Sequence, residues 1–408
     1  MDWRVMKGWT TTQIHVVVAS YLGWALDAFD FFLLVFVMQD VAKEFLTPFS
    51  SVAAALPLTL AMRPLGAYLF GRLADRFGRR PILMADVALY SLFGFATAFA
   101  PNLLVFLVIR ALFGVAMGGE WGIGASLTME TIPPQARGFV SGVLQSGYPS
   151  GYLLASVAFA LLYPHIGWRG MFVAGVLPAL LILYIRSKVP ESPAFQRQRE
   201  SHVTAFSVLA KHWKLALYAI LLMTAFNFFS HGTQDLYPAF LQKQRHFDHD
   251  TVSKMAVIYN IGAILGGLTF GSISQVLGRR RAIVAAALLA LPAAYLWAFS
   301  PTVTLLAIGA FAVQFFVQGA WGVIPAHLNE LSPPEARGTF PGTVYQLGNF
   351  IASSNAVIQV WIAEANGGDY ALALASVAIA ASLVIALLVG LGREAKGVDM
   401  ATGVPPGG

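Results

Sequence analysis

Long apolar runs separated by short polar segments recur along the whole 408-residue chain. Each run holds roughly 20 residues, which is enough for a helix to cross about 30 Å of hydrocarbon. The pattern predicts an all-α polytopic membrane protein with twelve spans, near residues 13–38, 51–71, 82–99, 103–127, 139–163, 169–186, 215–240, 253–273, 282–299, 303–326, 340–363 and 370–392.

The second half of the chain repeats the first half at an offset of 200 residues. The sequence GRLADRFGRR at Gly71–Arg80 is echoed by GSISQVLGRR at Gly271–Arg280. The same offset aligns Trp121 with Trp321, and the sequence PPQARG at 133–138 with PPEARG at 333–338. Because register is kept across several predicted helices and loops, we expect two six-helix halves related by an axis along the membrane normal.

The pattern also divides the chain into four segments. We expect an N-terminal half at 1–188, a cytoplasmic linker at 189–213, a C-terminal half at 214–396 and a tail at 397–408. The prolines and the polar run of the linker predict a solvated segment without a site. The Gly- and Pro-rich tail is expected to be disordered. No cleavable leader is expected, since the first apolar run is too long and lacks a small-residue cleavage site.

Composition and charge agree with a membrane protein. The chain is 57% hydrophobic and 11% charged, which excludes an ordinary soluble domain of this length. Of its 26 Lys and Arg, we place 19 on the side shared by the termini, five on the opposite side and two inside the membrane. This asymmetry predicts a multi-pass protein of the cell (inner) membrane with both termini cytoplasmic, and it explains the net charge of +6 without a nucleic-acid partner. The absence of cysteine excludes disulfides and thiol chemistry.

Polar residues in the seventh apolar run share one predicted helix face. Asn227, His231, Gln234 and Asp235 follow one another at i, i+4, i+7 and i+8. A histidine or an aspartate facing hydrocarbon would cost about 2 to 3 kcal/mol or more, so such groups normally face a bundle interior or a water-filled cavity. This face is therefore expected to line a transport path.

Four further charges lie at membrane depth. Asp27 and Asp30 are three residues apart in the first run, and two carboxylates this close suit a group that loads and releases a proton. A static pair with Arg110 of the fourth run is the alternative. Arg63 in the second run is the candidate anchor for a substrate carboxylate, since a guanidinium holds one through two parallel hydrogen bonds. For Arg63 the alternative is an internal salt bridge to either aspartate.

The loop Gly71–Arg80, between the second and third runs, resembles the signature loop of the major facilitator superfamily. Helix number, topology and duplication extend this resemblance over the whole chain. One acid among arginines at a tight glycine turn can form and break charge contacts between the halves as they move. The alternative is that the basic residues only set the orientation of the loop in the membrane. Since Gln275 stands where the repeat would place Asp75, we expect a one-sided gate. The candidate gating residues are Gly71, Asp75, Arg76, Gly78, Arg79, Arg80 and Arg137.

Within the superfamily, Asn227–Pro238 is similar to the helix-seven signature of the proton-coupled lactate and monocarboxylate permeases of the sialate:proton symporter family. A departure is Ala239, where the family often has Thr. The resemblance implies an Arg on helix two and a Gln and an Asn on helix eleven along the substrate path, matching Arg63, Gln346 and Asn349. It also links Arg110, in a helix-four Arg and Gly motif, to proton coupling.

These arguments define two sets of candidate residues. The substrate-binding set is Arg63, Asn227, His231, Gln234, Gln346, Asn349, Gln145, Tyr148 and Tyr345. The proton-coupling set is Asp27, Asp30, Arg110, His231 and Asp235. A role in helix packing is the alternative for the amides and for Tyr148.

The expected function is symport of a small monocarboxylate, of the lactate or pyruvate type, with a proton by alternating access. Another organic acid (an aromatic acid, a dicarboxylate or a sialate) or a non-transporting nutrient sensor are the alternatives. The linker is too short and polar to hold the two extra helices typical of sialic-acid carriers in the resembling family. We expect no enzyme, cofactor or metal site, because the sequence has no visible metal-ligand cluster or nucleophile with its base. The expected partners are the organic anion, the proton and the bilayer, and the protein is expected to function as a monomer.

Overall fold

The computed structural model describes residues 8–198 and 210–404, and this part of the chain contains helices and no strand. The first bundle consists of α1 (Thr11–Glu44), α2 (Phe49–Ala53), α3 (Ala55–Phe77), α4 (Arg79–Thr97), α5 (Leu103–Thr131), α6 (Arg137–Gln145), α7 (Gly147–Ala174), α8 (Ala179–Lys188) and α9 (Pro193–Gln198). The second consists of α11 (Trp213–Gln234), α12 (Tyr237–Lys243), α13 (His249–Leu277), α14 (Arg279–Phe299), α15 (Val303–Trp321), α16 (Ile324–Leu331), the 3-10 helix η2 (Pro334–Ala336), α17 (Phe340–Ala352), α18 (Asn355–Ala365) and α19 (Tyr370–Leu391).

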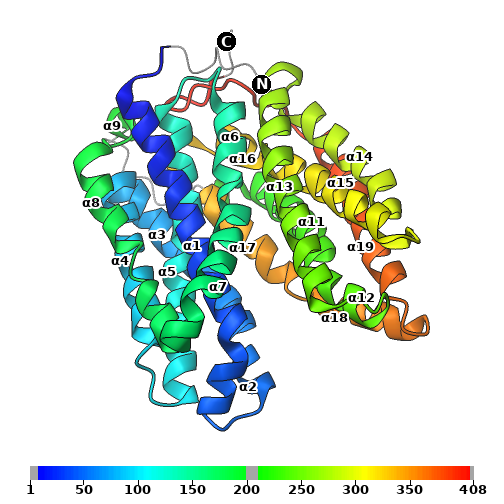
Figure 1. Cartoon of the computed structure of the whole chain (residues 1–408). Helices are drawn as coiled ribbons and strands as arrows, with labels where there is room; N and C mark the ends of the chain where they lie inside the picture. Colours follow the sequence, from blue (N-terminus) through cyan, green and yellow to red (C-terminus); the bar gives the residue numbers. More distant parts are fainter. Residues whose placement is uncertain (1–7, 199–209, 405–408) are drawn as a thin grey trace.

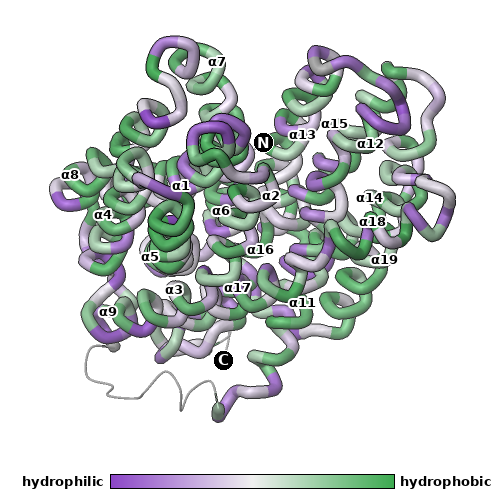
Figure 2. Tube along the Cα trace, turned by 90° about the horizontal axis from the view of Figure 1, so that it is seen from below, coloured by the Kyte–Doolittle hydropathy of each residue, from purple (hydrophilic) through white to green (hydrophobic). Residues whose placement is uncertain are grey.

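The two bundles lie side by side and converge at the end where both chain termini lie, then diverge toward the other end (Figure 1). We call the first end the terminal face and the second the opposite face. Hydrophobic residues predominate along the helices, and many of the most hydrophilic stretches lie in the connections between them (Figure 2). This arrangement suits helices that satisfy their own backbone hydrogen bonds while their sides face lipid.

In the part of the chain that the structure describes, the helices form twelve crossings, as predicted. Nine helical stretches in the described residues are long and apolar enough to span a membrane by length and composition alone. The third crossing, α4, is interrupted by charge, since it begins with Arg79 and Arg80 and carries Asp86. The sixth consists of the end of α7 and α8, after a break at Gly167, which has a φ of 61°. The eleventh consists of α17 and α18.

The seventh and eleventh predicted spans are among those that are broken rather than continuous. The seventh, expected as one helix over 215–240, ends at Gln234, and α12 begins with Tyr237 and Pro238. Proline lacks an N–H and its ring obstructs the preceding helical turn, which accounts for the break. The eleventh, expected over 340–363, breaks between Ala352 and Asn355. There the hydroxyls of Ser353 and Ser354 donate to carbonyls of their own turn.

Glycines let pairs of helices approach closely at equivalent places in the two halves. In the first half, Gly66 of α3 faces the backbone of Val115 on α5 so closely that a Cβ atom would overlap the Val115 carbonyl. In the second half, 200 residues on, Gly266 of α13 makes the same approach to Phe315 of α15. Small residues at helix contacts are a common packing device in membranes. The internal repeat is therefore also a repeat of packing.

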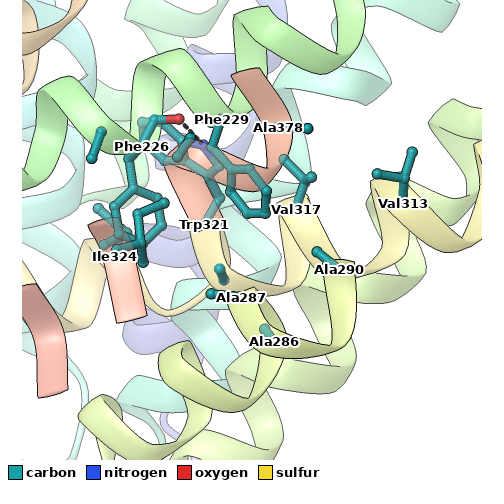
Figure 3. Packing of buried hydrophobic residues seen from close by; sticks show 14 of the residues in the cluster. Phe226, Phe229, Ala286, Ala287, Ala290, Val313, Val317, Trp321, Ile324 and Ala378 are labelled. Carbon is teal, nitrogen blue, oxygen red and sulfur yellow. Dashed lines mark hydrogen bonds between the residues drawn. The ribbon is translucent and has the colours of Figure 1, made fainter. Parts of the chain in front are cut away.

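The core of the second bundle joins α11, α14, α15 and α19. The Trp321 indole Nε1 donates to the Phe226 carbonyl at 3.2 Å, and the two rings meet edge to face with centroids 5.3 Å apart (Figure 3). Small alanines of α14, among them Ala286 and Ala290, are buried in the same cluster. This core fixes α11, which carries the polar residues of the seventh span.

The tail departs from the expectation of disorder over the residues that the structure describes, 397–404. Arg137 donates through Nη1 to the Val398 carbonyl at 2.7 Å, and Arg337 donates through Nη1 to the Met400 carbonyl. Val398 and Met400 are each 3% exposed. The buried arginines need acceptors, and the tail carbonyls supply them, which is why this segment is held. Residues 199–209 of the expected linker and 405–408 of the tail lie outside the described residues.

Candidate functional site

The terminal face is closed by hydrogen bonds between the two halves. Asp75, at the end of α3, accepts from the backbone N–H groups of Gly338 and Thr339 at 2.7 and 2.9 Å, and from the Thr339 hydroxyl at 2.6 Å. Gln275, at the end of α13, accepts from the Gly138 N–H at 3.0 Å. The expectation of a one-sided gate is therefore wrong. An amide oxygen accepts an N–H bond as a carboxylate does, although without the charge.

Other contacts close the same face. The Ser126 hydroxyl donates to the Arg337 carbonyl at 2.7 Å, and the Ala326 N–H donates to the Ser141 hydroxyl at 3.0 Å. Arg137 lies 3.7 Å from Glu330 of the other half. All of these groups come from the loops and helix ends around the repeated motifs. The structure is thus closed at its terminal face.

The candidate gating residues of the loop after α3 hold one another in place. Gly78 joins α3 to α4 with a φ of 110°, a conformation that favours glycine. Arg79 bridges Asp75 and Glu130, at 3.1 Å from each. Glu191 of the expected linker accepts from the backbone N–H groups of Arg79 and Arg80 at 2.9 and 3.2 Å, which caps the N-terminus of α4.

The remaining gating candidates differ in their surroundings. Gly71 lies so close to the other half that a Cβ atom would stand 2.7 Å from the Thr339 Cα. Arg80 donates to the Arg186 carbonyl within its own half. Arg76 is exposed, with its guanidinium 5.1 Å from the Phe77 ring. Gly71 and Asp75 therefore touch the partner half directly, whereas Arg76 and Arg80 do not do so through these contacts.

Four candidates meet where the seventh span is broken. His231 lies with Nδ1 3.1 Å from Asp235 Oδ1 and with Nε2 2.9 Å from Asn349 Oδ1 on α17. The side chains of His231 and Asp235 are 24% and 37% exposed, so the pair is not enclosed by protein on all sides. Asn349 donates in turn to Gln346 Oε1 at 3.4 Å. A histidine held between a carboxylate and an amide is suited to binding and passing a proton.

Two residues of the predicted polar face have other partners. Gln234 donates through Nε2 to Gln314 Oε1 of α15 at 2.9 Å. Gln314 itself donates to the Thr233 hydroxyl. Asn227 donates to the Met223 carbonyl of its own helix at 2.8 Å and is 3% exposed. The structure therefore joins His231, Asp235, Gln346 and Asn349 in one network, and it places Gln234 in a packing contact.

Arg63 of α3 is buried but weakly engaged. It is 3% exposed, and its Nε and Nη2 atoms make no hydrogen bond within the described residues. Asp27 Oδ2 lies 3.8 Å from Nη2, which is an ion pair without a hydrogen bond. The guanidinium carbon also lies 5.9 Å from the centroid of the Trp24 ring. The alternative considered for Arg63, an internal salt bridge to Asp27, is therefore present only as this 3.8 Å ion pair. It leaves Nε and Nη2 of Arg63 without a hydrogen-bond acceptor within the described residues.

Arg110 and Asp30 lie deeper in the first bundle. The Arg110 guanidinium packs on the Phe113 ring, with 4.0 Å between carbon and centroid, and none of its three nitrogens makes a hydrogen bond within the described residues. Asp30 and Asp27 are its charged neighbours, yet both carboxylates also lack hydrogen-bond partners there. The static pair with Arg110, considered as the alternative, is therefore present only as charges lying near one another, without hydrogen bonds within the described residues.

Aromatic residues surround the candidates between the bundles. Trp121 donates through Nε1 to Gln145 Oε1 at 3.3 Å and meets the Tyr345 ring at 4.7 Å. Tyr148 stacks on Trp24 with ring centroids 5.5 Å apart. Gln145 and Tyr345 are thus linked to each other through Trp121, which comes from the first half while Tyr345 comes from the second.

The candidates chosen from the sequence did not include Asp86, Glu120, Trp24 or Trp121. Asp86 and Glu120 are fully buried near Asp27. Asp86 could have been noticed as an acid inside an apolar run, which is the feature that made Asp27 a candidate. Among the described residues, no three acidic or histidine side chains converge as a metal site would require.

A separate apolar groove of about 630 Å³ opens between α11, α18 and α19. Its lining includes Leu221, Phe228, Ile358 and Val384. The polar candidates His231, Asn349 and Arg63 do not line it. An organic anion would find no charged partner there, so the groove is not the candidate site.

Comparisons with known proteins agree with this architecture. A family model described as Major Facilitator Superfamily matches residues 21–236, and one described as Sugar (and other) transporter matches residues 218–392. The carboxylic acid transporter protein homolog of Saccharomyces cerevisiae is 28% identical over 373 residues, which cover 85% of this chain and 60% of that protein. The chain therefore spans less than two thirds of the length of this relative.

Two further relatives match over most of their length. The sialic acid transporter NanX of Escherichia coli is 26% identical over 392 residues, which cover 94% of this chain and 95% of that protein. A solved structure of the proton:xylose symporter XylE has a TM-score of 0.71 at 17% identity and covers 95% of this chain and 97% of that chain. These families are membrane transporters and not enzymes. Because the first family model covers more than half of the sequence and the fold agrees, this chain belongs to the Major Facilitator Superfamily.

Proposed function

We propose that this chain carries a small monocarboxylate, of the lactate or pyruvate type, together with a proton by alternating access. The observation that carries the proposal is Arg63, a buried guanidinium at membrane depth whose Nε and Nη2 make no hydrogen bond within the described residues. A guanidinium binds a carboxylate through two parallel, charge-assisted hydrogen bonds. An anion that reached Arg63 would compete with the long contact to Asp27 and release that carboxylate.

The His231–Asp235 pair supports the proton part of the proposal. The imidazole lies between an acid and an amide and is only partly covered by protein in this conformation. Arg63 is one of the charged neighbours of His231, so a bound anion and a proton on His231 would stabilise each other. Entry of an anion alone against an interior-negative potential costs about 2.3 kcal/mol per 100 mV, and co-entry of a proton removes this cost.

We further propose that the terminal face is the cytoplasmic face of the cell membrane. The basic loops around Arg79 and Arg279 lie on this side, as the positive-inside rule requires. The described conformation is then closed to the cytoplasm. His231 and Asp235 are accessible in this conformation, and access from the cytoplasm would require the halves to separate at Asp75 and Gln275. The similarity to transporters named for carboxylic and sialic acids supports an organic acid as the substrate class.

An aromatic monocarboxylate is the second candidate substrate. The stacked rings of Trp24 and Tyr148 lie next to Arg63, so an aromatic acid could stack on them while its carboxylate binds the guanidinium. A small aliphatic acid would make no stacking contact with the rings of Trp24 and Tyr148. The two candidates differ in one measurable respect, which is whether an aromatic acid is taken up or only blocks the uptake of lactate.

The test is uptake of labelled L-lactate into proteoliposomes under an imposed proton gradient, with and without an uncoupler. We expect gradient-driven accumulation that the uncoupler abolishes and that Arg63→Gln loses. Accumulation of benzoate in place of lactate would favour the aromatic candidate. If neither acid is accumulated although one of them binds, the protein is a sensor rather than a transporter.

A further inference from the structure

The first bundle contains more buried acids than buried bases at membrane depth. Asp27, Asp30, Asp86 and Glu120 are at most 2% exposed, and the nearby arginines are Arg63 and Arg110. None of the carboxylate oxygens of these four acids makes a hydrogen bond within the described residues. Two arginines cannot neutralise four carboxylates. A buried carboxylate without a partner takes up a proton rather than remain charged in a low dielectric, so the cluster must hold protons.

The arginines are not shared evenly among the four acids. Arg63 forms the long ion pair with Asp27 and is also a charged neighbour of Glu120. Arg110 is a charged neighbour of Asp30 and Asp27. The charged neighbours of Asp86 are Glu120 on α5 and Asp27 on α1, both of which are acids. Among these four acids, Asp86 is therefore the one whose charged neighbours in the described part of the chain are all acids.

The helix next to Asp86 leaves space for its side chain. Gly119 of α5 faces Asp86 so closely that a Cβ atom there would stand 2.5 Å from Asp86 Oδ1. On the other side of the cluster, a Cβ atom on Gly23 of α1 would overlap Glu120 Oε1. These two glycines let both carboxyl groups fit between the helices. Within the described residues Asp86 thus has a glycine opposite it, rather than the basic partner that a structural ion pair would require.

Tyr90 supplies a second, independent observation. It follows Asp86 by one turn on α4, is fully buried, and its hydroxyl makes no hydrogen bond within the described residues. Its charged neighbours are the four acids of the cluster. From α8, the titratable Tyr184 lies 2.6 Å from His15 and is engaged there. The described part of the chain brings no three acidic or histidine side chains together as a metal site would, so the ligand that fits here is a proton.

We propose that Asp86 is a second proton-binding site of the transport cycle, separate from the His231–Asp235 pair, with the Tyr90 hydroxyl as the hydrogen-bond donor to its ionised form. This inference rests on the proposed function. A carboxyl proton is taken up at Asp86 in one conformation and released in the other, and no covalent bond other than the O–H bond changes. With one proton at each site, two protons accompany one monocarboxylate anion. Each cycle then moves one net positive charge inward.

The first experiment measures lactate uptake into proteoliposomes at a fixed proton gradient, with and without an inside-negative diffusion potential. For the wild type we expect the potential to raise the initial rate at least about fivefold, because a net charge moves with each substrate. For Asp86→Asn we expect less than about a twofold response, with lactate exchange retained as evidence of a folded carrier. Asp40→Asn, on the distant end of α1, is the matched control and should respond as the wild type does.

Two results would overturn the proposal. The first is a wild-type proton-to-lactate ratio of one, taken from the proton gradient at which net flux reverses. The second is a voltage response of Asp86→Asn equal to that of the wild type. It would mean that Asp86 keeps its proton throughout the transport cycle. The proton-to-lactate ratio is measured on the wild type, so it tests the proposal even if Asp86→Asn fails to fold.

A direct readout separates this inference from the proposed function. Infrared difference spectra between acidic and alkaline buffer should contain the C=O band of a protonated carboxyl group, and Asp86→Asn should lose that band. If the wild type carries no acid yet the Asp86 band titrates, the substrate assignment fails and the proton site stands. If the band does not change with pH in a protein that transports lactate, the proton site fails alone.

Discussion

Asp75 and Gln275, which are 200 residues apart, make the same contact with opposite halves of the protein. Asp75 Oδ1 accepts from the Gly338 N–H at 2.7 Å, and Gln275 Oε1 accepts from the Gly138 N–H at 3.0 Å. Gly138 and Gly338 are themselves related by the same offset. The closed terminal face is therefore held by two equivalent hydrogen-bonded contacts, one at Asp75 and one at Gln275, which we call the two clasps. One clasp is charged and makes two further bonds with Thr339, whereas the other is neutral and makes one further bond, from Gln275 Nε2 to the Pro134 carbonyl at 3.1 Å.

The first prediction concerns the unequal strength of these clasps. Asp75→Ala removes an acceptor of three hydrogen bonds, two of them from backbone N–H groups of the other half. Charge-assisted bonds contribute about 1.5 to 3 kcal/mol each and neutral ones about 0.5 to 1.5 kcal/mol. We expect Asp75→Ala to open the terminal face more often than Gln275→Ala does, by about tenfold or more in population.

The absence of cysteine makes this prediction directly measurable. Thr343→Cys, at a position 8% exposed beside the closed face, reports opening through its rate of maleimide labelling. The labelling rate should rise in the order wild type, Gln275→Ala, Asp75→Ala. Arg281→Ala, which removes an exposed charge near the same face, serves as the control. Equal rates for the two clasp variants would show that the charge on Asp75 adds nothing to closure.

Much of this architecture could be predicted from the sequence, because a helix in lipid must satisfy its own backbone and so requires a long apolar run. The contact between Asp75 and the other half follows from the repeated loops. The breaks in the seventh and eleventh spans were not predicted. Hydropathy averages over a window and does not register Pro238, nor Ser353 and Ser354, as interruptions of an apolar run.

The candidate site could be predicted only in part, for a different reason. The spacing of His231 and Asp235 predicts their contact, since residues four apart meet on a helix. The same spacing placed Gln234 on the path, but α11 ends there and its amide bonds Gln314 instead. Asp86 is visible in the sequence as a single acid inside an apolar run, but its role could not be assigned, because its neighbours come from α1 and α5. Contacts between distant helices leave no local pattern.

The second prediction concerns Arg63. Arg63→Lys keeps the positive charge but loses the planar fork that makes two parallel bonds to a carboxylate. We expect KM for the substrate to rise about tenfold or more with a smaller change in kcat, since the loss is one of binding. The measurement is initial uptake at varied substrate concentration. Arg186→Lys, at a residue contacted through its backbone carbonyl, should keep the wild-type KM.

A different outcome would assign Arg63 to another role. If Arg63→Lys leaves KM unchanged and instead lowers thermal stability, the guanidinium acts as the structural partner of Asp27. In that case Arg63→Gln should also lower stability by leaving Asp27 without its partner, and adding Asp27→Asn should restore it, since the double variant removes both charges. Loss of binding in the single variant that the double variant does not recover supports a direct contact with the substrate.

The third prediction concerns the coupling pair. Asp235→Asn keeps the size of the side chain and removes the carboxylate that faces His231 Nδ1. We expect proton-driven accumulation to fall at least about tenfold, while exchange of internal for external substrate is retained, because exchange needs no net proton movement. Asp250→Asn, at an exposed acid that pairs with Lys254, is the control for a general loss of negative charge. Equal loss of accumulation and exchange would point to a role in substrate binding instead.

The fourth prediction concerns the segment 397–404, which lies across the closed face. Arg137 belongs to the first half and Arg337 to the second, and each donates to a carbonyl of this segment, at Val398 and Met400. Both arginines are at most 3% exposed, so removing the segment would take acceptors from two buried guanidinium groups. A lost acceptor at such a group costs about 1 to 3 kcal/mol.

A chain shortened to end at Lys396 should therefore have a closed state weakened by about 2 kcal/mol or more, because both halves lose a shared contact. Labelling of Thr343→Cys should accelerate, and the shortened chain should unfold at a lower temperature. Replacing Val398 and Met400 with alanine is the matched control, since it removes side chains and keeps the two carbonyls. If the alanine variant opens the face as much as the truncation does, apolar burial of the segment holds it there. If only the truncation opens it, the carbonyl contacts of Arg137 and Arg337 are what join the halves.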